Sequence, residues 1–165
     1  TTPRGSYLDA LSPLTVTLGV QNVSFVAQAV DWIPESLFQI LTAAYRHRGF
    51  SFVRILQRCP EFVGNMFEPW VHDPQRMLML THADGIRVSP ALQKIYRNQL
   101  PHDPADINRA REIASSEDPI PVGILYRNPE VPCYEDLRGA GKLRTADQVR
   151  GALDGELDKF TVWPQ

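Results

Sequence analysis

The pattern of hydrophobic and polar residues predicts strands that alternate with helices. Residues 25–30 are a short apolar run of the kind found in buried strands. Pro34 opens a predicted helix in which apolar residues recur at helical spacing as far as Tyr45. A second strand is predicted over residues 50–56, which are rich in Phe, Val and Ile. This succession has the length of a βαβ unit, whose right-handed crossover makes its two strands parallel.

The charges of the predicted central helix agree with its direction. Glu35 lies in the first turn, where the helix dipole favours a negative charge. Arg46, His47 and Arg48 are expected in the last turn, where the dipole favours positive charge. Gly49 is expected to end the helix at the position after its C-cap.

Further elements are predicted on both sides of this unit. Each helix has an N-cap residue or a proline at its start. The predicted helices are residues 14–18 between Ser12-Pro13 and Gly19, Ser89-Pro90 to Tyr96, and 105–115 capped by Asp103-Pro104. The predicted strands are residues 77–80 and 122–126. A last helix is capped by Thr145 and has Val149, Leu153, Leu157 and Phe160 on its apolar face.

A long apolar loop is predicted over residues 58–76. Three prolines and one glycine interrupt it, and Phe62, Phe67 and Trp70 lie between them. Loops of this length in compact domains are usually functional or cover another part of the protein. One interpretation of these aromatic residues is a surface that contacts another protein chain.

Composition places the chain in a broad class. It has 165 residues, of which 43% are hydrophobic and 22% charged, so it has enough apolar surface to fold as one domain or one domain with an extension. The net charge of −2 argues against a nucleic-acid-binding protein, which needs a basic excess. No run of 18 apolar residues predicts a membrane span, and no charged-then-apolar leader opens the sequence. Two cysteines are too few for a disulfide framework, which favours a cytoplasmic protein.

Cys59 is the candidate metal ligand. It follows the second predicted strand, and the carboxyl ends of parallel strands are where α/β proteins place their sites. Arg58 and Arg54 precede it, and nearby cations favour the thiolate that binds metal. From position alone, an inert buried cysteine is the favoured alternative. Cys133 has no basic neighbour or second ligand close in sequence and is interpreted as a packed structural residue.

Other motifs indicate structure rather than chemistry. Gly139-Ala140-Gly141-Lys142 lacks the spacing of a phosphate-binding loop and is interpreted as a turn, as is Asp84-Gly85. The three tryptophans are expected to pack within the protein. The four histidines lack the spacing of a zinc site.

A family resemblance changes the interpretation of Cys59. Residues 5–70, from GSYLDALSPL to FVGNMFEPW, resemble the β subunit of 2-oxoacid:ferredoxin oxidoreductases, and most of all its 2-oxoglutarate branch. Residues from about Met77 onward, including Gly123-Ile124-Leu125-Tyr126-Arg127, resemble the C-terminal extension of that subunit. The resemblance implies an α/β fold with a mostly parallel sheet. Residues 1–60 would be the second half of a thiamine-diphosphate-binding domain, and residues 61–165 an α+β extension.

The family also implies a reaction and its cofactors. Its members decarboxylate a 2-oxoacid on thiamine diphosphate held by Mg²⁺, pass electrons through a 4Fe-4S cluster to ferredoxin, and transfer the acyl group to coenzyme A. The α subunit of the same enzyme would be a partner, with neither nucleic acid nor membrane involved.

Within this resemblance, Cys59 in Leu56-Gln57-Arg58-Cys59-Pro60 matches the fourth cysteine ligand of the cluster. The C-x-x-C pair and the third cysteine are absent from the chain, as is the G-D-G…N motif for Mg²⁺. Thr1-Thr2-Pro3 resembles the tail of the loop that follows that motif. The resemblance therefore implies about half of a β subunit, inactive alone, whose catalytic and cofactor-contacting residues stay unassigned.

Two alternatives remain open. One is a fragment of another thiamine-dependent decarboxylase without a cluster, in which Cys59 would be an ordinary core residue. The other is a noncatalytic α/β module for subunit assembly, in which the apolar loop would contact a partner.

Overall fold

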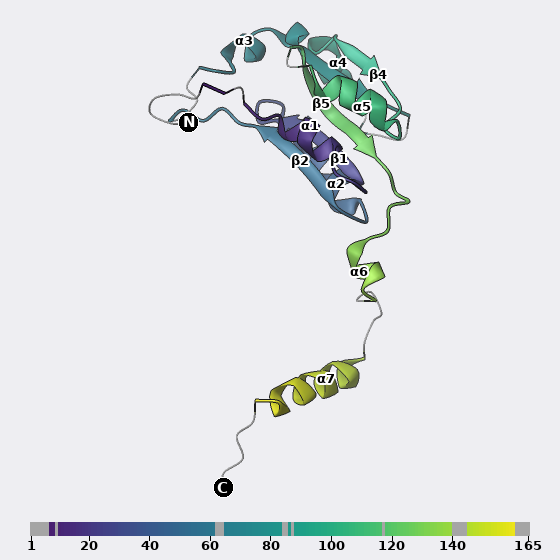
Figure 1. Ribbon diagram of the computed structural model, residues 1–165. Helices are drawn as coiled ribbons and strands as arrows, with labels where there is room; N and C mark the ends of the chain where they lie inside the picture. Colours follow the sequence, from purple (N-terminus) through teal and green to yellow (C-terminus); the bar gives the residue numbers. More distant parts are fainter. Residues whose placement is uncertain are drawn as a thin grey trace. The chain divides into compact units, whose positions relative to one another are not determined.

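A computed structural model describes most of the chain, which divides into two compact units, Thr1–Val131 and Pro132–Gln165 (Figure 1). The residues that it describes are 7–8, 10–61, 65–83, 86, 88–116, 118–139 and 145–160. Thr1-Thr2-Pro3, Phe62, Asp84-Gly85, residues 140–142 of the glycine-rich turn and Trp163 lie outside these residues, so the interpretations placed on them stay predictions.

The first unit is built on a five-stranded sheet with the order β2-β1-β5-β3-β4. β1 and β2 are parallel, and β3 is parallel to both β4 and β5. The two groups meet where β1 and β5 pair in antiparallel fashion. The expected α/β fold with a mostly parallel sheet is therefore confirmed. The strands are β1 (Phe25–Val30), β2 (Ser51–Leu56), β3 (Met77–Thr81), β4 (Gln99–Pro101) and β5 (Ile120–Arg127).

The predicted βαβ unit is present, and its helix ends earlier than expected. The helix α2 (Pro34–Arg46) connects β1 to the parallel strand β2. Only Arg46 lies in its last turn, because the chain leaves the helix at His47, whose backbone is extended. Gly49 lies beyond this end with a φ of 141°, and a Cβ there would come within 3.0 Å of the Ser24 hydroxyl oxygen. Gly49 therefore serves the tight turn into β2 rather than the helix cap.

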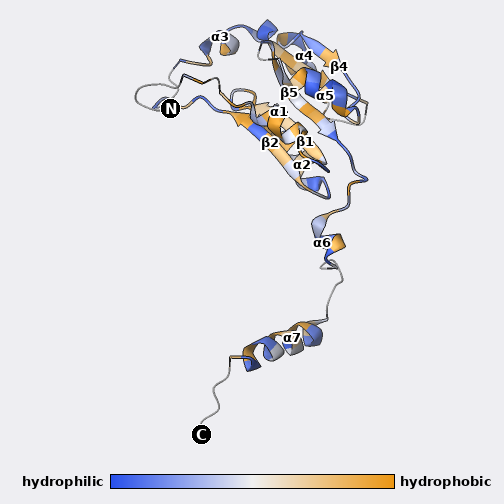
Figure 2. Ribbon diagram, in the orientation of Figure 1, coloured by the Kyte–Doolittle hydropathy of each residue, from blue (hydrophilic) through white to orange (hydrophobic). Residues whose placement is uncertain are grey.

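Helices cover both faces of the sheet, because side chains along β1 alternate between two cores. Phe25, Ala27 and Ala29 belong to one core with Ile40 of α2, while Val26 belongs to the other. This second core is covered by α1 (Pro13–Leu18) and α5 (Ile107–Ala114). All six residues of β1 are buried, including the polar Gln28, and hydrophobic colour marks most of the strand in Figure 2.

The remaining helices of this unit follow the predictions in part. Ser12 caps α1 as expected, and Ser89 caps α4 (Pro90–Ile95). The helix expected from Ala105 begins only at Ile107, because Asp106 is the N-cap and accepts hydrogen bonds from two backbone N–H groups. Asp103 instead accepts a hydrogen bond from the backbone N–H of Ala105 at 2.9 Å, which makes a turn before the helix. Three short elements were not predicted, namely α3 (Glu68–Val71), the 3-10 helix η1 (Pro74–Arg76) and the strand β4.

The described residues of the second unit form the helices α6 (Tyr134–Leu137) and α7 (Ala146–Asp158). Thr145 caps α7 as predicted, and Gln148 completes a capping box. The four residues of its predicted apolar face are all exposed, so the face is not buried within the described residues. The two compact units divide the chain at residue 131, and the sheet takes strands from both sides of residue 60. The predicted boundary between residues 60 and 61 separates a thiamine-diphosphate-binding domain from its extension in a larger subunit, and it stays a prediction.

No helix among the described residues is long and apolar enough to cross a membrane.

Candidate functional site at the carboxyl ends of β1 and β2

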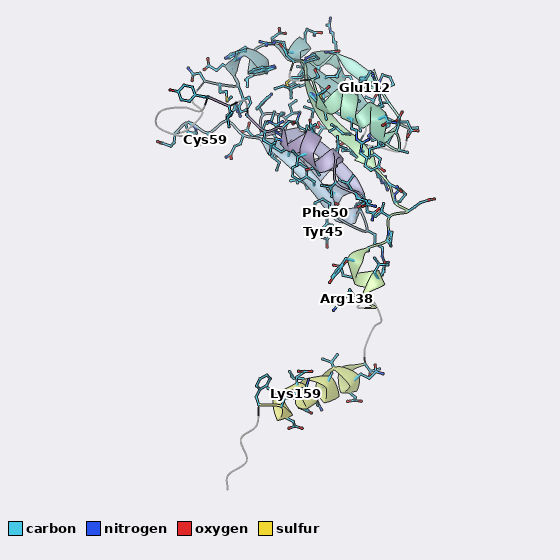
Figure 3. All side chains as sticks on the ribbon, viewed as in Figure 1. Tyr45, Phe50, Cys59, Glu112, Arg138 and Lys159 are labelled. Carbon is cyan, nitrogen blue, oxygen red and sulfur yellow. The ribbon has the colours of Figure 1, made fainter. Side chains whose placement is uncertain are left out.

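Cys59 lies three residues beyond β2, on the segment that leaves the sheet (Figure 3). Its thiol is free, and its side chain is partly exposed. The end of β1 lies beside the end of β2, because the backbone N–H of Asp31 donates to the Leu56 carbonyl at 3.1 Å. Two parallel strands therefore bring the loops that follow them to one edge, as the position of Cys59 predicted.

Arg58 fixes the segment that carries Cys59. Its backbone N–H and its Nε both donate to the carboxylate of Asp31, at 3.2 and 3.0 Å. Its guanidinium carbon also lies 5.8 Å from the centre of the Trp32 ring. Arg58 was expected to favour a thiolate at Cys59 by its positive charge. The structure gives that charge a carboxylate partner, which reduces the field that reaches the neighbouring thiol.

Arg54 lies on β2 itself and lines a cavity of about 500 Å³ on one face of the sheet. It pairs in register with Gln28 of β1, which also lines the cavity. Gln28 is only 2% exposed, and its Nε2 donates to the Pro121 carbonyl at 2.8 Å. Because a carbonyl can only accept a hydrogen bond, the amide atom that faces it is the Nε2 donor, and the other amide atom is the Oε1 acceptor. This buried Oε1 has no hydrogen-bond donor in the described part of the chain.

Two aromatic residues of the predicted loop, Phe67 and Trp70, pack within this unit. The rings of Trp32 and Phe67 lie 5.6 Å apart, and those of Phe67 and Trp70 lie 6.2 Å apart. Trp70 also donates to Asp118 at 3.2 Å and lies beneath the guanidinium of Arg76 at 4.7 Å. Trp32 and Trp70 are therefore packing residues, as predicted. Phe67 and Trp70 are engaged inside the chain, which weakens their interpretation as a surface for a partner.

Cys133 lies in the second unit, where it is the N-cap residue of α6 and donates a hydrogen bond from its thiol to Glu135. Among the described residues, no group of three His, Cys, Asp or Glu side chains could hold a metal ion. A 4Fe-4S cluster needs four ligands and Mg²⁺ needs several oxygens, so the described residues do not by themselves fit either group. Cys59 offers one ligand at most. Asp31, which contacts the neighbouring Arg58, was not identified from the sequence as part of this site.

Comparison with known proteins identifies relatives of the chain. A family model for the C-terminal part of the pyruvate ferredoxin oxidoreductase beta subunit matches residues 91–141. A 2-oxoacid:ferredoxin oxidoreductase subunit beta from Sulfolobus sp is 26% identical over 139 residues, which are 81% of this chain and 41% of that protein. The beta subunit of a 2-oxoacid:ferredoxin oxidoreductase 2 from Aeropyrum pernix is 27% identical over 132 residues, which are 78% of this chain and 38% of that protein.

A third relative is named for its substrate. The 2-oxoglutarate oxidoreductase subunit KorB from Mycobacterium tuberculosis is 33% identical over 87 residues, which are 52% of this chain and 23% of that protein. The chain thus spans well under half the length of these relatives. The family model and the relatives agree, and the chain is similar to a C-terminal part of the β subunit of 2-oxoacid:ferredoxin oxidoreductases.

Proposed function

We propose that the chain is part of the β subunit of an enzyme that oxidises 2-oxoacids, with 2-oxoglutarate as the favoured substrate. The support for the substrate class is the names of the relatives from Sulfolobus and Aeropyrum. The support for 2-oxoglutarate is the name of the relative from Mycobacterium tuberculosis. The α subunit of the same enzyme, coenzyme A and ferredoxin are the proposed partners.

In the proposed reaction, the bond between the oxo carbon and the carboxylate of the 2-oxoacid breaks and carbon dioxide leaves. A thioester bond forms between the oxo carbon and the sulfur of coenzyme A, whose thiol proton is released. Two electrons leave the substrate, and each reduces one ferredoxin. Thiamine diphosphate with Mg²⁺ would supply the carbanion chemistry, and a 4Fe-4S cluster would supply single-electron transfer.

The observation that carries a role for this chain is the position of Cys59. It lies at the shared carboxyl edge of two parallel strands, directly after Arg58, which Asp31 holds in place. We propose that Cys59 supplies one thiolate ligand to the cluster in the intact β subunit. The other three ligands and the residues for Mg²⁺ would come from outside this chain.

The experiment uses the intact β subunit in complex with its α subunit, purified without oxygen. Cys59→Ser is compared with Cys133→Ser by iron content and by the EPR spectrum of the reduced protein. We expect Cys59→Ser to lose or alter the cluster signal and Cys133→Ser to keep it. An unchanged signal and full iron content in Cys59→Ser would show that Cys59 is not a ligand, and an intact wild-type complex without iron would support a thiamine-dependent decarboxylase without a cluster.

A further inference from the structure

The sheet has a second carboxyl-terminal edge, opposite the one that carries Cys59. Because β5 is antiparallel to β1, the three parallel strands β5, β3 and β4 end at the other side of the sheet (Figure 1). His82 follows β3 directly, His102 follows β4 directly, and Arg127 is the last residue of β5. Three adjacent strands thus each bring one nitrogen-rich side chain to the same edge. Crevices beyond the carboxyl ends of strands are where open α/β sheets bind ligands.

These three residues line one open cavity. Its volume is about 730 Å³, and Thr81, Asp103 and Pro104 also contribute to its wall. The size is within the range of sites for small molecules. The cavity shares no lining residue with the one that contains Gln28 and Arg54. Neither Asp31, Arg58 nor Cys59 lines it, so it is a separate site from the one proposed around Cys59.

The backbone holds the wall of this cavity in place. The N–H of His102 donates to the Thr81 carbonyl at 3.0 Å, which ties the end of β4 to the end of β3. The N–H of Arg127 donates to the Pro104 carbonyl at 2.8 Å, which ties the end of β5 to the loop after β4. β5 also carries a bulge opposite Val26 and Ala27, just before Arg127. Bulges change the direction of the side chains that follow them and are frequent beside functional sites.

The charges on this wall favour an anion. Arg127 forms no ion pair with a carboxylate in the described part of the chain, and its side chain is exposed at the cavity. Asp103 is the acidic residue of the wall, and its Oδ1 already accepts the N–H of Ala105 at 2.9 Å. A guanidinium without a counter-ion, on a concave surface, is suited to a carboxylate or phosphate, which it can bind through two hydrogen bonds.

The two histidines add nitrogen atoms to the same site. Their ring centres lie 5.8 Å apart in an edge-to-face arrangement. The Nε2 of His102 lies 2.8 Å from the Ile124 carbonyl, which can only accept, so Nε2 carries a proton. The Nδ1 of His102 is buried and has no hydrogen-bond partner in the described part of the chain.

We propose that the cavity at the carboxyl ends of β3, β4 and β5 binds a small anion that carries a carboxylate or a phosphate group, with Arg127 as its main contact and His82 and His102 beside it. A metal ion is a poorer fit, because no suitable group of three ligands occurs among the described residues. The proposal does not depend on Cys59, on thiamine diphosphate or on the cluster. The two proposals can therefore fail separately.

The experiment titrates the full chain with two probes, inorganic phosphate and succinate, and follows binding by isothermal titration calorimetry. Arg127→Gln removes the guanidinium charge, and Arg97→Gln removes an equal charge from an exposed arginine that precedes β4, at the amino end of that strand. We expect wild type and Arg97→Gln to bind at least one probe with a dissociation constant of about 1 mM or below. We expect Arg127→Gln to bind at least about tenfold more weakly, which equals about 1.4 kcal/mol.

Circular dichroism shows whether each variant is folded. If Arg127→Gln does not fold, His82→Gln takes its place, and we expect it to weaken binding several-fold. The probe that binds more tightly identifies the ligand class, since succinate represents carboxylates and inorganic phosphate represents phosphate groups. The proposal is overturned if wild type binds neither probe in the millimolar range, or if Arg97→Gln weakens binding as much as the cavity variants do.

Discussion

Arg58 reaches Asp31 across 27 positions of the chain and binds its carboxylate with both its backbone N–H and its Nε. One residue of the loop after β2 is thereby fixed to one residue of the loop after β1. Cys59 is the next residue, so the position of its backbone depends directly on this contact. A carboxylate that accepts from a backbone N–H and a guanidinium forms stronger hydrogen bonds than neutral groups do.

Asp31→Asn is predicted to loosen this edge of the sheet without unfolding the protein. The Arg58 side chain is 48% exposed, so solvent screens the ion pair and the amide can still accept one hydrogen bond. We expect a loss of about 0.5–1 kcal/mol in the free energy of unfolding, measured with urea. Glu130→Gln is the matched control, because it removes an exposed carboxylate elsewhere and should change stability by less. Equal stability of wild type and Asp31→Asn in low and high salt would show that the pair contributes nothing.

His47 predicts a pH dependence of stability. Burial, followed by the positive charge of Arg127, lowers the pKa of His47 below its ordinary value of 6.5. The unfolded chain therefore binds a proton at a higher pH than the folded chain does. The contribution of neutral His47 is complete above pH 6.5 and is lost as the pH falls from 6.5 through the lower pKa of the folded state.

The measurement compares urea unfolding of wild type and His47→Gln in mildly acidic and mildly alkaline buffer. We expect wild type to lose more stability on acidification than the variant does, because glutamine does not titrate. His72→Gln replaces an exposed histidine and should retain the behaviour of the wild type. The same loss of stability in His47→Gln as in wild type would rule out His47 as its source.

The sequence predicted the elements whose side chains have one clear pattern. The bounds of β1 were predicted correctly, because five of its six residues are apolar, and the parallel β1–α2–β2 unit followed from length and order. β4 was not predicted, because its three residues Gln99–Pro101 are too few to show a period. Nothing in the local pattern could show that β5 runs antiparallel to β1, because strand direction depends on how distant segments meet.

The dependence on distant segments also explains which residues of the two sites were not predicted. Cys59 was placed correctly after β2, since a strand end can be predicted from local sequence. The partner of Arg58 could have been found only by aligning the ends of the two parallel strands, which places Asp31 beside the residues after Leu56. The convergence of His82, His102 and Arg127 required β4 and the direction of β5, neither of which the sequence showed.

Gly123 is predicted to be essential for the first unit. Its φ is 138°, a conformation that favours glycine, and a Cβ at this position would lie 2.8 Å from the Cβ of Leu80 on β3. We expect Gly123→Ala to destabilise this unit by about 2 kcal/mol or more, measured by urea unfolding. Gly151→Ala is the control, because Gly151 lies in α7 with open space around its Cβ position, and alanine favours a helix by about 1 kcal/mol. Equal stability of Gly123→Ala and wild type would show that β5 can move away from β3 without lowering the free energy of unfolding.

Asp118 is predicted to titrate at an unusually low pH. The hydrogen bond from Arg76 is the main cause that lowers the pKa of Asp118 below its ordinary value of 3.8, and the hydrogen bond from Trp70 adds to it. The Arg76 guanidinium also covers the ring of Trp70, so the carboxylate, the guanidinium and the indole form one contact group. In Arg76→Gln, we expect the midpoint of the Asp118 carboxyl titration, followed by carbon NMR, to rise toward 3.8. Arg97→Gln removes the same charge elsewhere and should leave the midpoint low, whereas a midpoint that Arg76→Gln does not move would show that Arg76 does not set the pKa of Asp118.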